Sequence, residues 1–181
     1  MIRIAITGAG GRMGKALIEA ILLTDGVELS AALERPESSL VGVDSGELAG
    51  VGRNGVKVAG SISEIADQFD VLIDFTVPAA TVANAAFCAA HNKNMVIGTT
   101  GLDAEQNAQI IAAAENSAIC MASNFPPALT SALSWLSWPL LYWVMRLILK
   151  FLKPIIVTKS MPLRVLPCHW VSLLPERWAE I

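Results

Sequence analysis

The chain has 181 residues, 13 Lys and Arg against 16 Asp and Glu, and three cysteines. Its length suits one domain, or one domain and a further piece, with a real hydrophobic core. The net charge of −3 gives no general attraction for nucleic acid. Cys88, Cys120 and Cys168 have neither close pairing nor metal-ligand spacing, so we expect buried thiols in a reducing compartment and no metal site.

The first motif lies near the N-terminus, where no secretory leader is visible. An apolar run at residues 2–7 precedes the glycine-rich sequence GAGGRMG at 8–14, and a helix-like stretch follows at 15–23. This order is typical of a dinucleotide-binding turn, in which glycines let a pyrophosphate approach the backbone and the first N–H groups of the helix face the anion. The spacing fits G-x-x-G-x-x-G better than G-x-G-x-x-G. The alternative is a merely tight turn between strand and helix.

Apolar runs and helical segments then alternate up to residue 122. Asp103 and Gln106 form a capping-box pattern at the start of the last helix, which is expected to run to about residue 115. The alternation predicts an α/β fold, a Rossmann-like doubly wound parallel sheet with helices on both faces. Strands are predicted at residues 2–7, 27–33, 71–75, 95–99 and 118–122, helices at 15–23, 62–69, 79–91 and 103–115, and a long loop with at most short strands at 38–60.

In such a sheet the ligand lies outside the carboxyl ends of the strands. Glu34 and Arg35 follow the second strand, where an acid can accept hydrogen bonds from the adenosine ribose and a guanidinium can hold a 2′-phosphate. Both NADH and NADPH are therefore expected cofactors, and a solvated surface pair is the alternative. The expected cofactor-binding residues are Gly8, Ala9, Gly10, Gly11, Arg12, Met13, Gly14, Glu34, Arg35, Phe75, Thr76, Gly98, Thr99, Thr100, Ala122, Ser123, Asn124 and Phe125.

The segments GAGGRMG, LER, IDFTVP, IGTTG and SNF, in this order over residues 1–125, resemble dihydrodipicolinate reductase of bacterial lysine (diaminopimelate) biosynthesis. The resemblance implies an NAD(P)H-dependent oxidoreductase of the cytoplasm, ordinarily a homotetramer. It implies that residues 8–14 hold the pyrophosphate and that Glu34 and Arg35 lie at the adenosine end. Residues 98–100 and 122–125 would lie beside the nicotinamide half.

The composition changes abruptly after residue 125. Residues 1–125 carry 7 Lys and Arg against 14 Asp and Glu, whereas residues 126–181 carry 6 against 2, together with all five tryptophans. The family's substrate domain has an HHRHK motif and then a Gly-Thr pair, and neither follows residue 125 here. His169 has no charged neighbour. We therefore expect a dinucleotide-binding domain at 1–125, an aberrant apolar tail at 126–181, no catalytic residue and no family tetramer.

A shifted reading frame explains this tail. Residues 155–167 can be encoded by a DNA sequence that, when read from one base earlier, encodes HHRHKVDAPSGTA. This peptide contains the motif that is missing from the chain. Three residues of the shifted reading are fixed, because the single codons of Met and Trp both end in G. The G of Met161 followed by the Pro162 codon reads as Ala, and the G of Trp143 or Trp170 followed by a Val codon reads as Gly. All three agree with the family pattern. Loss of one base near the codon of Phe125 would account for the whole tail.

A membrane anchor is the rival interpretation of the tail. Residues 133–152 are mostly apolar and long enough to span a bilayer, with Trp135, Trp138 and Trp143 as interfacial aromatics. Against it, Arg146 and Lys150 fall within the span, each unfavourable by ~2.5–3.5 kcal/mol if central. Three functions stay open: a reductase, a nucleotide-binding remnant without activity, and a membrane-tethered Rossmann-like protein. We favour the second for this polypeptide and the first for its lineage.

Overall fold

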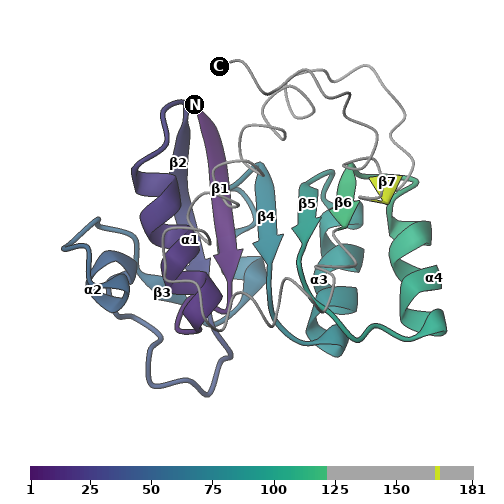
Figure 1. Cartoon of the computed structure of the whole chain (residues 1–181), viewed down its shortest axis with the longest axis horizontal. Helices are drawn as coiled ribbons and strands as arrows, with labels where there is room; N and C mark the ends of the chain where they lie inside the picture. Colours follow the sequence, from purple (N-terminus) through teal and green to yellow (C-terminus); the bar gives the residue numbers. More distant parts are fainter. Residues whose placement is uncertain (122–165, 168–181) are drawn as a thin grey trace, which may run out of the picture.

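The computed structural model describes residues 1–121 and 166–167. Its strands form one parallel sheet in the order β3-β2-β1-β4-β5-β6-β7 (Figure 1). The predicted parallel α/β architecture is confirmed. The strands are β1 (Ile2–Thr7), β2 (Val27–Leu33), β3 (Val58–Ala59), β4 (Val71–Asp74), β5 (Asn94–Ile97), β6 (Ile119–Met121) and β7 (Leu166–Pro167).

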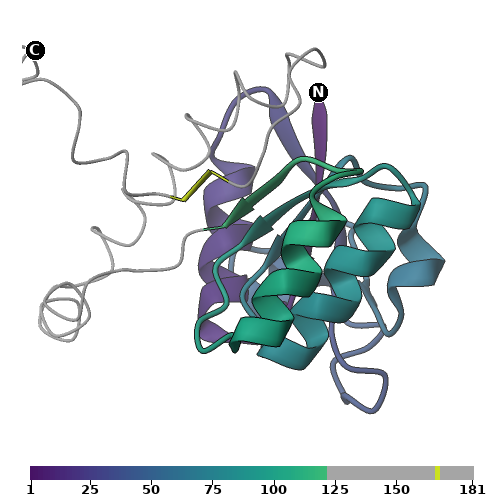
Figure 2. The same ribbon diagram turned by 90° about the vertical axis from the view of Figure 1, so that its right-hand side faces the viewer.

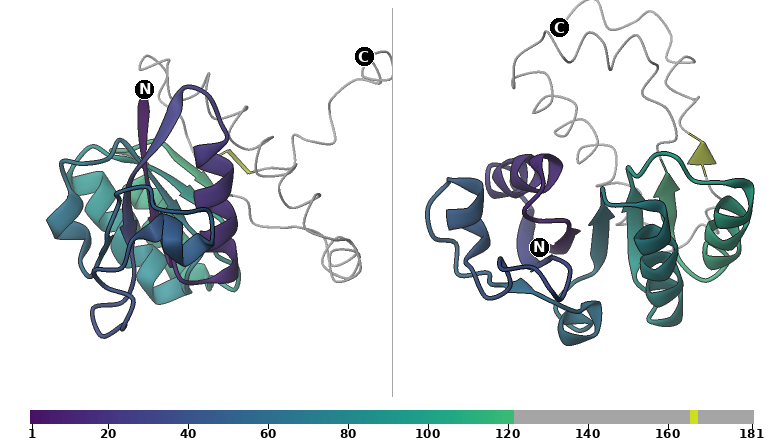
Figure 3. Two further views of the ribbon diagram at one scale, coloured as in Figure 1. Left: turned by 90° about the vertical axis from the view of Figure 1, so that its left-hand side faces the viewer. Right: turned by 90° about the horizontal axis from the view of Figure 1, so that it is seen from below.

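Helices cover both faces of the sheet. Figure 2 shows α1 on one side and α3 with α4 on the other, and Figure 3 shows the same layers from two further directions. The small helix α2 contacts α1, and α3 contacts α4. The helices are α1 (Arg12–Leu22), α2 (Ser45–Ala49), the 3-10 turn η1 (Ile62–Ile65), α3 (Pro78–Ala90) and α4 (Ala104–Ala113).

Alternate strand residues build two separate cores because successive side chains point to opposite faces of a sheet. Ile4 and Ile6 of β1 pack with Leu17 of α1 on one face. Leu72 of β4 packs with Ile110 of α4 on the other. Each such side chain contributes about 1.5–3 kcal/mol when it is fully buried. Because both faces are covered, the strands read as continuous apolar runs in the sequence.

The loop at residues 38–60 contains an element that the sequence did not predict. Helix α2 begins there because the carboxylate of Asp44 accepts hydrogen bonds from Gly46 N (2.9 Å) and Glu47 N (3.1 Å). The same carboxylate also accepts from the backbone of Asn54 and Gly55. Burial raises the pKa of Asp44, but the four N–H donors outweigh it, and the pKa lies below the usual value.

The capping box predicted at the start of α4 is confirmed. Gln106 N donates to Asp103 Oδ1 (2.7 Å), and Asp103 N donates to Gln106 Oε1 (3.0 Å). Helix α1, by contrast, begins at Arg12, earlier than the predicted Lys15. The first turn therefore includes Gly14, which packs directly on the backbone of the preceding glycine turn.

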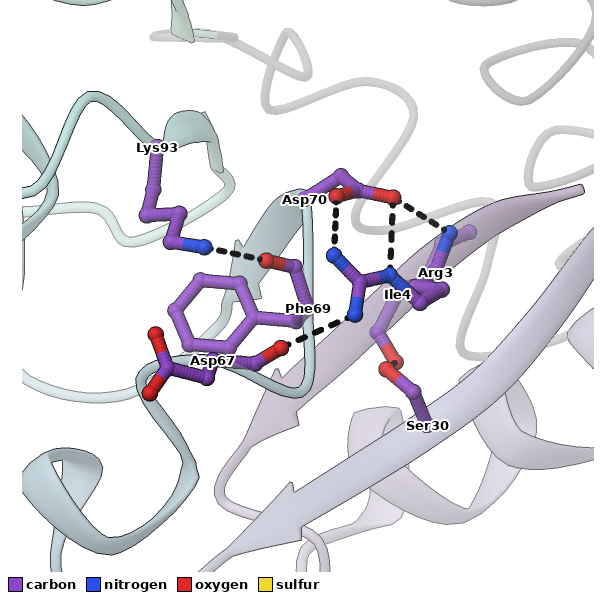
Figure 4. A network of polar contacts seen from close by, with 7 residues as sticks. All are labelled: Arg3, Ile4, Ser30, Asp67, Phe69, Asp70 and Lys93. Carbon is purple, nitrogen blue, oxygen red and sulfur yellow. Dashed lines mark hydrogen bonds and ion pairs between the residues drawn. The ribbon is translucent and has the colours of Figure 1, made fainter.

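An ion pair joins β1 to the residue before β4 at the amino-terminal edge of the sheet. Arg3 Nη2 lies 2.7 Å from Asp70 Oδ1, and Arg3 Nε donates to Asp70 Oδ2 at 3.2 Å (Figure 4). Arg3 Nη1 donates to the carbonyl oxygen of Asp67, and Lys93 Nζ donates to that of Phe69 (2.9 Å). The hydrogen bond from Arg3 is the main reason why the pKa of Asp70 is lowered.

We expect the Arg3–Asp70 ion pair to make the free energy of unfolding depend on pH. The pKa of Asp70 is lower in the folded state than in the unfolded state, where it is about 3.9. The ion pair therefore adds to the free energy of unfolding at pH values above the unfolded-state pKa. This stabilisation is lost as the pH falls through the folded-state pKa. At pH 7, Asp70→Asn should lower the free energy of unfolding by about 1 kcal/mol or less, because solvent screens a partly exposed carboxylate. Urea unfolding of both proteins from pH 7 to pH 3 tests this: the difference should shrink in acid, and a constant difference would contradict it.

Candidate functional site

The strand order places one ligand position at the carboxyl ends of the strands. From β1 the chain proceeds to β2 and β3 on one side, whereas β4, β5 and β6 continue on the other. The order therefore reverses between β1 and β4, and open parallel sheets bind ligands outside the carboxyl ends at such a reversal. We call this the carboxyl edge. The strand arrowheads in Figure 1 point toward it. The Arg3–Asp70 pair lies at the opposite edge, near the start of β1 and directly before β4.

The glycine turn after β1 occupies the reversal point. Gly8 has φ +74°, which L side chains rarely adopt, and its N–H and that of Ala9 donate to Leu33 O at 2.9 and 3.0 Å. A Cβ on Gly14 would lie 2.2 Å from Gly8 O and 2.8 Å from Ala9 Cα. The first turn of α1 therefore packs on bare backbone, and only glycine fits at position 14.

The N-terminus of α1 is open to a ligand. Its N-cap, Gly11, makes no side-chain cap hydrogen bond, and the first turn holds no acidic residue. The exposed Arg12 is the first helical residue. Helices α2 and α4 instead have their first N–H groups occupied by the carboxylates of Asp44 and Asp103. The first N–H groups of a helix lack intrahelical acceptors and carry partial positive charge, so the start of α1 suits an anion.

Glu34 connects the end of β2 to the glycine turn through hydrogen bonds of its carboxylate. Its Oε1 accepts a hydrogen bond from Gly10 N at 2.8 Å, and its Oε2 accepts one from Arg35 N at 3.2 Å. A Cβ on Gly10 would lie 3.1 Å from Glu34 Oε1 and 2.3 Å from Leu40 Cδ1. Glu34 is half-buried, whereas Arg35 is exposed. The structure thus brings the predicted acid and the predicted turn together and leaves the guanidinium accessible.

The ends of β4 and β5 complete the described part of the carboxyl edge. The methyl carbon Cγ2 of Thr76 would lie 3.2 Å from a Cβ on Gly8, so the loop after β4 borders the glycine turn. The ring of Phe75 covers Gly98, because a Cβ there would lie 2.1 Å from ring atom Cε1. Thr100, next to the buried Thr99, is exposed. Four predicted segments therefore meet at one edge.

A buried carboxylate, which is not among the predicted cofactor-binding residues, lies beneath these loops. Asp74, the last residue of β4, is 0% exposed. Thr76 N and Oγ1 donate to its Oδ1 at 2.9 and 2.6 Å, and Asn84 Nδ2 donates to its Oδ2 at 2.9 Å. Thr99 Oγ1 lies 3.4 Å from Oδ1 and accepts from Thr81 Oγ1 at 2.7 Å. The hydroxyl of Thr99 is thus directed into this network. The sequence contains one signal for this network: an acidic residue ends an apolar strand, and hydroxyl residues lie nearby.

Several predictions fall on residues that the structure does not describe. Ala122, Ser123, Asn124 and Phe125 lie outside the described residues, as do His169 and the apolar stretch at 133–152. Within residues 1–121 and 166–167, no helix is long and apolar enough to cross a membrane. In the same part of the chain, no group of three or more His, Cys, Asp or Glu could hold a metal ion.

Comparison with known proteins gives one consistent family. The family described as "Dihydrodipicolinate reductase, N-terminus" matches residues 2–125. A 4-hydroxy-tetrahydrodipicolinate reductase of Saccharophagus degradans is 57% identical over 123 residues, which are 68% of this chain and 46% of that protein.

Two solved structures share the fold. The dipicolinate-bound dihydrodipicolinate reductase from Paenisporosarcina sp. TG-14 has a TM-score of 0.56 and 28% identity, covering 69% of this chain and 48% of that one. An amine dehydrogenase from Mycobacterium smegmatis has a TM-score of 0.54 and 26% identity, covering 68% and 39%. The chain therefore spans about half the length of the reductases that it matches.

Proposed function

The chain belongs to the dihydrodipicolinate reductase family, and on this basis we propose that its residues 1–125 form a dinucleotide-binding domain that binds NADH or NADPH. The resemblance found in the sequence is confirmed by the family match over residues 2–125. The observation that carries the proposal is the uncapped start of α1 behind a turn of bare glycine backbone. A pyrophosphate there would supply the acceptors that the first N–H groups of α1 lack.

Titration of the full chain with NADH, NADPH and ADP-ribose tests this proposal. Calorimetry should show saturable binding of all three ligands with one site per chain. Inorganic phosphate at the same concentration is the control, because an anion alone uses only the start of the helix. Absence of saturable binding to a chain that melts cooperatively would refute the proposal.

The two residues after β2 should set the choice between the cofactors. Glu34→Gln keeps an oxygen for Gly10 N–H but removes the charge offered to the adenosine ribose. We expect it to weaken NADH binding about fivefold, the difference between a charged and a neutral hydrogen bond. Binding of NADPH should stay or improve, because an acid repels a 2′-phosphate. Arg35→Ala, the matched partner, should weaken NADPH binding and leave NADH unchanged; equal losses for both cofactors would contradict this assignment.

We further propose that residues 126–181 are an out-of-frame translation of the family's second half, so that this polypeptide is a cofactor-binding remnant of a reductase from lysine biosynthesis. Two observations support the proposal: the composition changes after residue 125, and the 57% identical reductase aligns with this chain over 123 residues, only 46% of its own length. Sequencing the DNA across codons 124–128 tests it. A missing base in a run of T or C is the expected finding, whereas an intact frame with no restorable family sequence downstream would exclude the shift.

A further inference from the structure

Among the described residues, no cation forms an ion pair with the buried carboxylate of Asp74. Asp74 is 0% exposed, and the two ion pairs of the described residues join Arg3 to Asp70 and Arg53 to Glu47. Burying a carboxylate costs free energy unless hydrogen bonds replace the lost water. Here the donors are the backbone of Thr76 and the side chains of Thr76, Thr99 and Asn84.

These donors come from three different segments. Thr76 lies in the loop after β4, Asn84 in helix α3, and Thr99 in the loop after β5. Gly98 N also donates to the backbone oxygen of Asp74 at 2.8 Å. One carboxylate therefore fixes the two loops against each other and against α3. An apolar residue of similar volume would fill the space but would not orient these loops.

The loop after β4 borders the glycine turn, and the loop after β5 packs against the loop after β4 through Gly98. Thr76 uses its hydroxyl on Asp74 while its methyl group is directed toward Gly8. The ring of Phe75, the residue after Asp74, covers Gly98. A change in the carboxylate would therefore reach the surface of the carboxyl edge through Phe75 and Thr76. It would leave Glu34 in place, because Glu34 is held by its own hydrogen bond from Gly10 N.

The thiol of Cys88 lies in the electrostatic field of the same carboxylate. Burial, and secondarily the charge of Asp74, raise the pKa of Cys88 to about 12. Cys88 is 0% exposed and belongs to the core beneath α3 and α4. The network is therefore bounded on its inner side by the apolar core to which Cys88 belongs.

We propose that Asp74 is a positioning residue that, through Thr76 and Thr99, shapes the part of the carboxyl edge that receives the nicotinamide half of the cofactor. The carboxylate does not touch the cofactor; it orders the loops that do. This proposal rests on the proposed function. Its distinctive consequence is that the two halves of the dinucleotide respond differently, because the adenosine half is held at Glu34 and the pyrophosphate at α1.

The experiment compares NADH with ADP-ribose, which lacks the nicotinamide, on variants of the full chain. Asp74→Asn keeps the shape and removes the charge, and the half-buried Asn84 can turn its amide to present oxygen to the new donor. Thr99→Val removes one hydroxyl at nearly constant volume. Asp70→Asn is the matched control, since it makes the same change at the other end of β4, beside Arg3.

We expect Asp74→Asn and Thr99→Val to weaken NADH binding about tenfold, as the loss of one hydrogen bond to a charged group would. Binding of ADP-ribose should change by less than about twofold, within the uncertainty of such comparisons. Asp70→Asn should change neither. Equal losses for both ligands, or no loss of NADH, would overturn the inference. If Asp74→Asn fails to fold, Thr99→Val tests the inference by the same comparison of the loss of NADH binding with the loss of ADP-ribose binding. Failure of the parent chain to bind either ligand would instead refute the proposed function.

Discussion

Replacing Gly14 by alanine should abolish nucleotide binding and lower the free energy of unfolding by about 2 kcal/mol. The added Cβ would meet Gly8 O at 2.2 Å and Ala9 O at 2.8 Å, and both are backbone atoms that cannot rotate away. Overpacking costs about 1–3 kcal/mol, and so short a contact with backbone atoms belongs at the upper end of that range. Alanine's better helix propensity offsets about 1 kcal/mol, which leaves a loss of about 2 kcal/mol. Because α1 would have to move off the turn, its N–H groups would no longer converge on the proposed pyrophosphate position.

Gly60→Ala is the matched control for this substitution. A Cβ at Gly60 would make ordinary contacts, with Pro36 Cα at 3.4 Å and Val41 Cγ2 at 3.7 Å. We expect that variant to bind NADH like the parent chain and to change the free energy of unfolding by less than about 1 kcal/mol. Urea unfolding and calorimetric titration of the three proteins give both quantities. A Gly14→Ala protein that binds NADH normally would show that α1 does not hold the pyrophosphate.

The largest functional change should follow from restoring the reading frame. We expect the 181-residue chain to oxidise NADPH no faster than a protein-free blank in the presence of the family's substrate. Orienting two reactants contributes about 7–11 kcal/mol to catalysis, and the HHRHK motif that would orient the substrate is missing from this chain. Inserting one base near the codon of Phe125 should bring that motif back and raise turnover by at least about a thousandfold.

Two controls make that result interpretable. A restored-frame protein whose motif histidines are replaced by alanine should bind NADPH but turn over poorly, because only the substrate half is damaged. A restored-frame protein with Gly14→Ala should lose cofactor binding. Turnover by the unaltered chain itself would contradict the proposal that it is catalytically incomplete. A restored chain that folds and binds NADPH but stays inactive would argue against the shifted frame.

The sheet was predictable because local and global signals agree in residues 1–121. Strand β2 was predicted at its observed bounds, and the capping box at Asp103 was predicted from two residues alone. Each buried strand is an apolar run bounded by turn residues, and parallel sheets covered on both faces leave this pattern. The α/β fold followed from the alternation of such runs with helices.

Features that depend on contacts between distant segments could not be predicted. Helix α2 exists because the carboxylate of Asp44 is shared with Asn54 and Gly55, ten and eleven residues further on. The role of Gly10 depends on Leu40, whose side chain reaches over the turn. The same holds for Asp74, since its donors lie in two loops and a helix. The assignment of the eighteen site residues to the cofactor stays a prediction.

Backbone NMR of the full chain during titration with NADH tests most directly whether the glycine turn is a cofactor site. The amide resonances of Arg12, Met13 and Gly14 should shift and saturate with NADH, and should do so equally with ADP-ribose, because both ligands carry the pyrophosphate. Resonances of Arg3 and Lys93, at the opposite edge of the sheet, should stay unchanged. Saturating shifts centred on that opposite edge, or none at the start of α1, would contradict the proposed function.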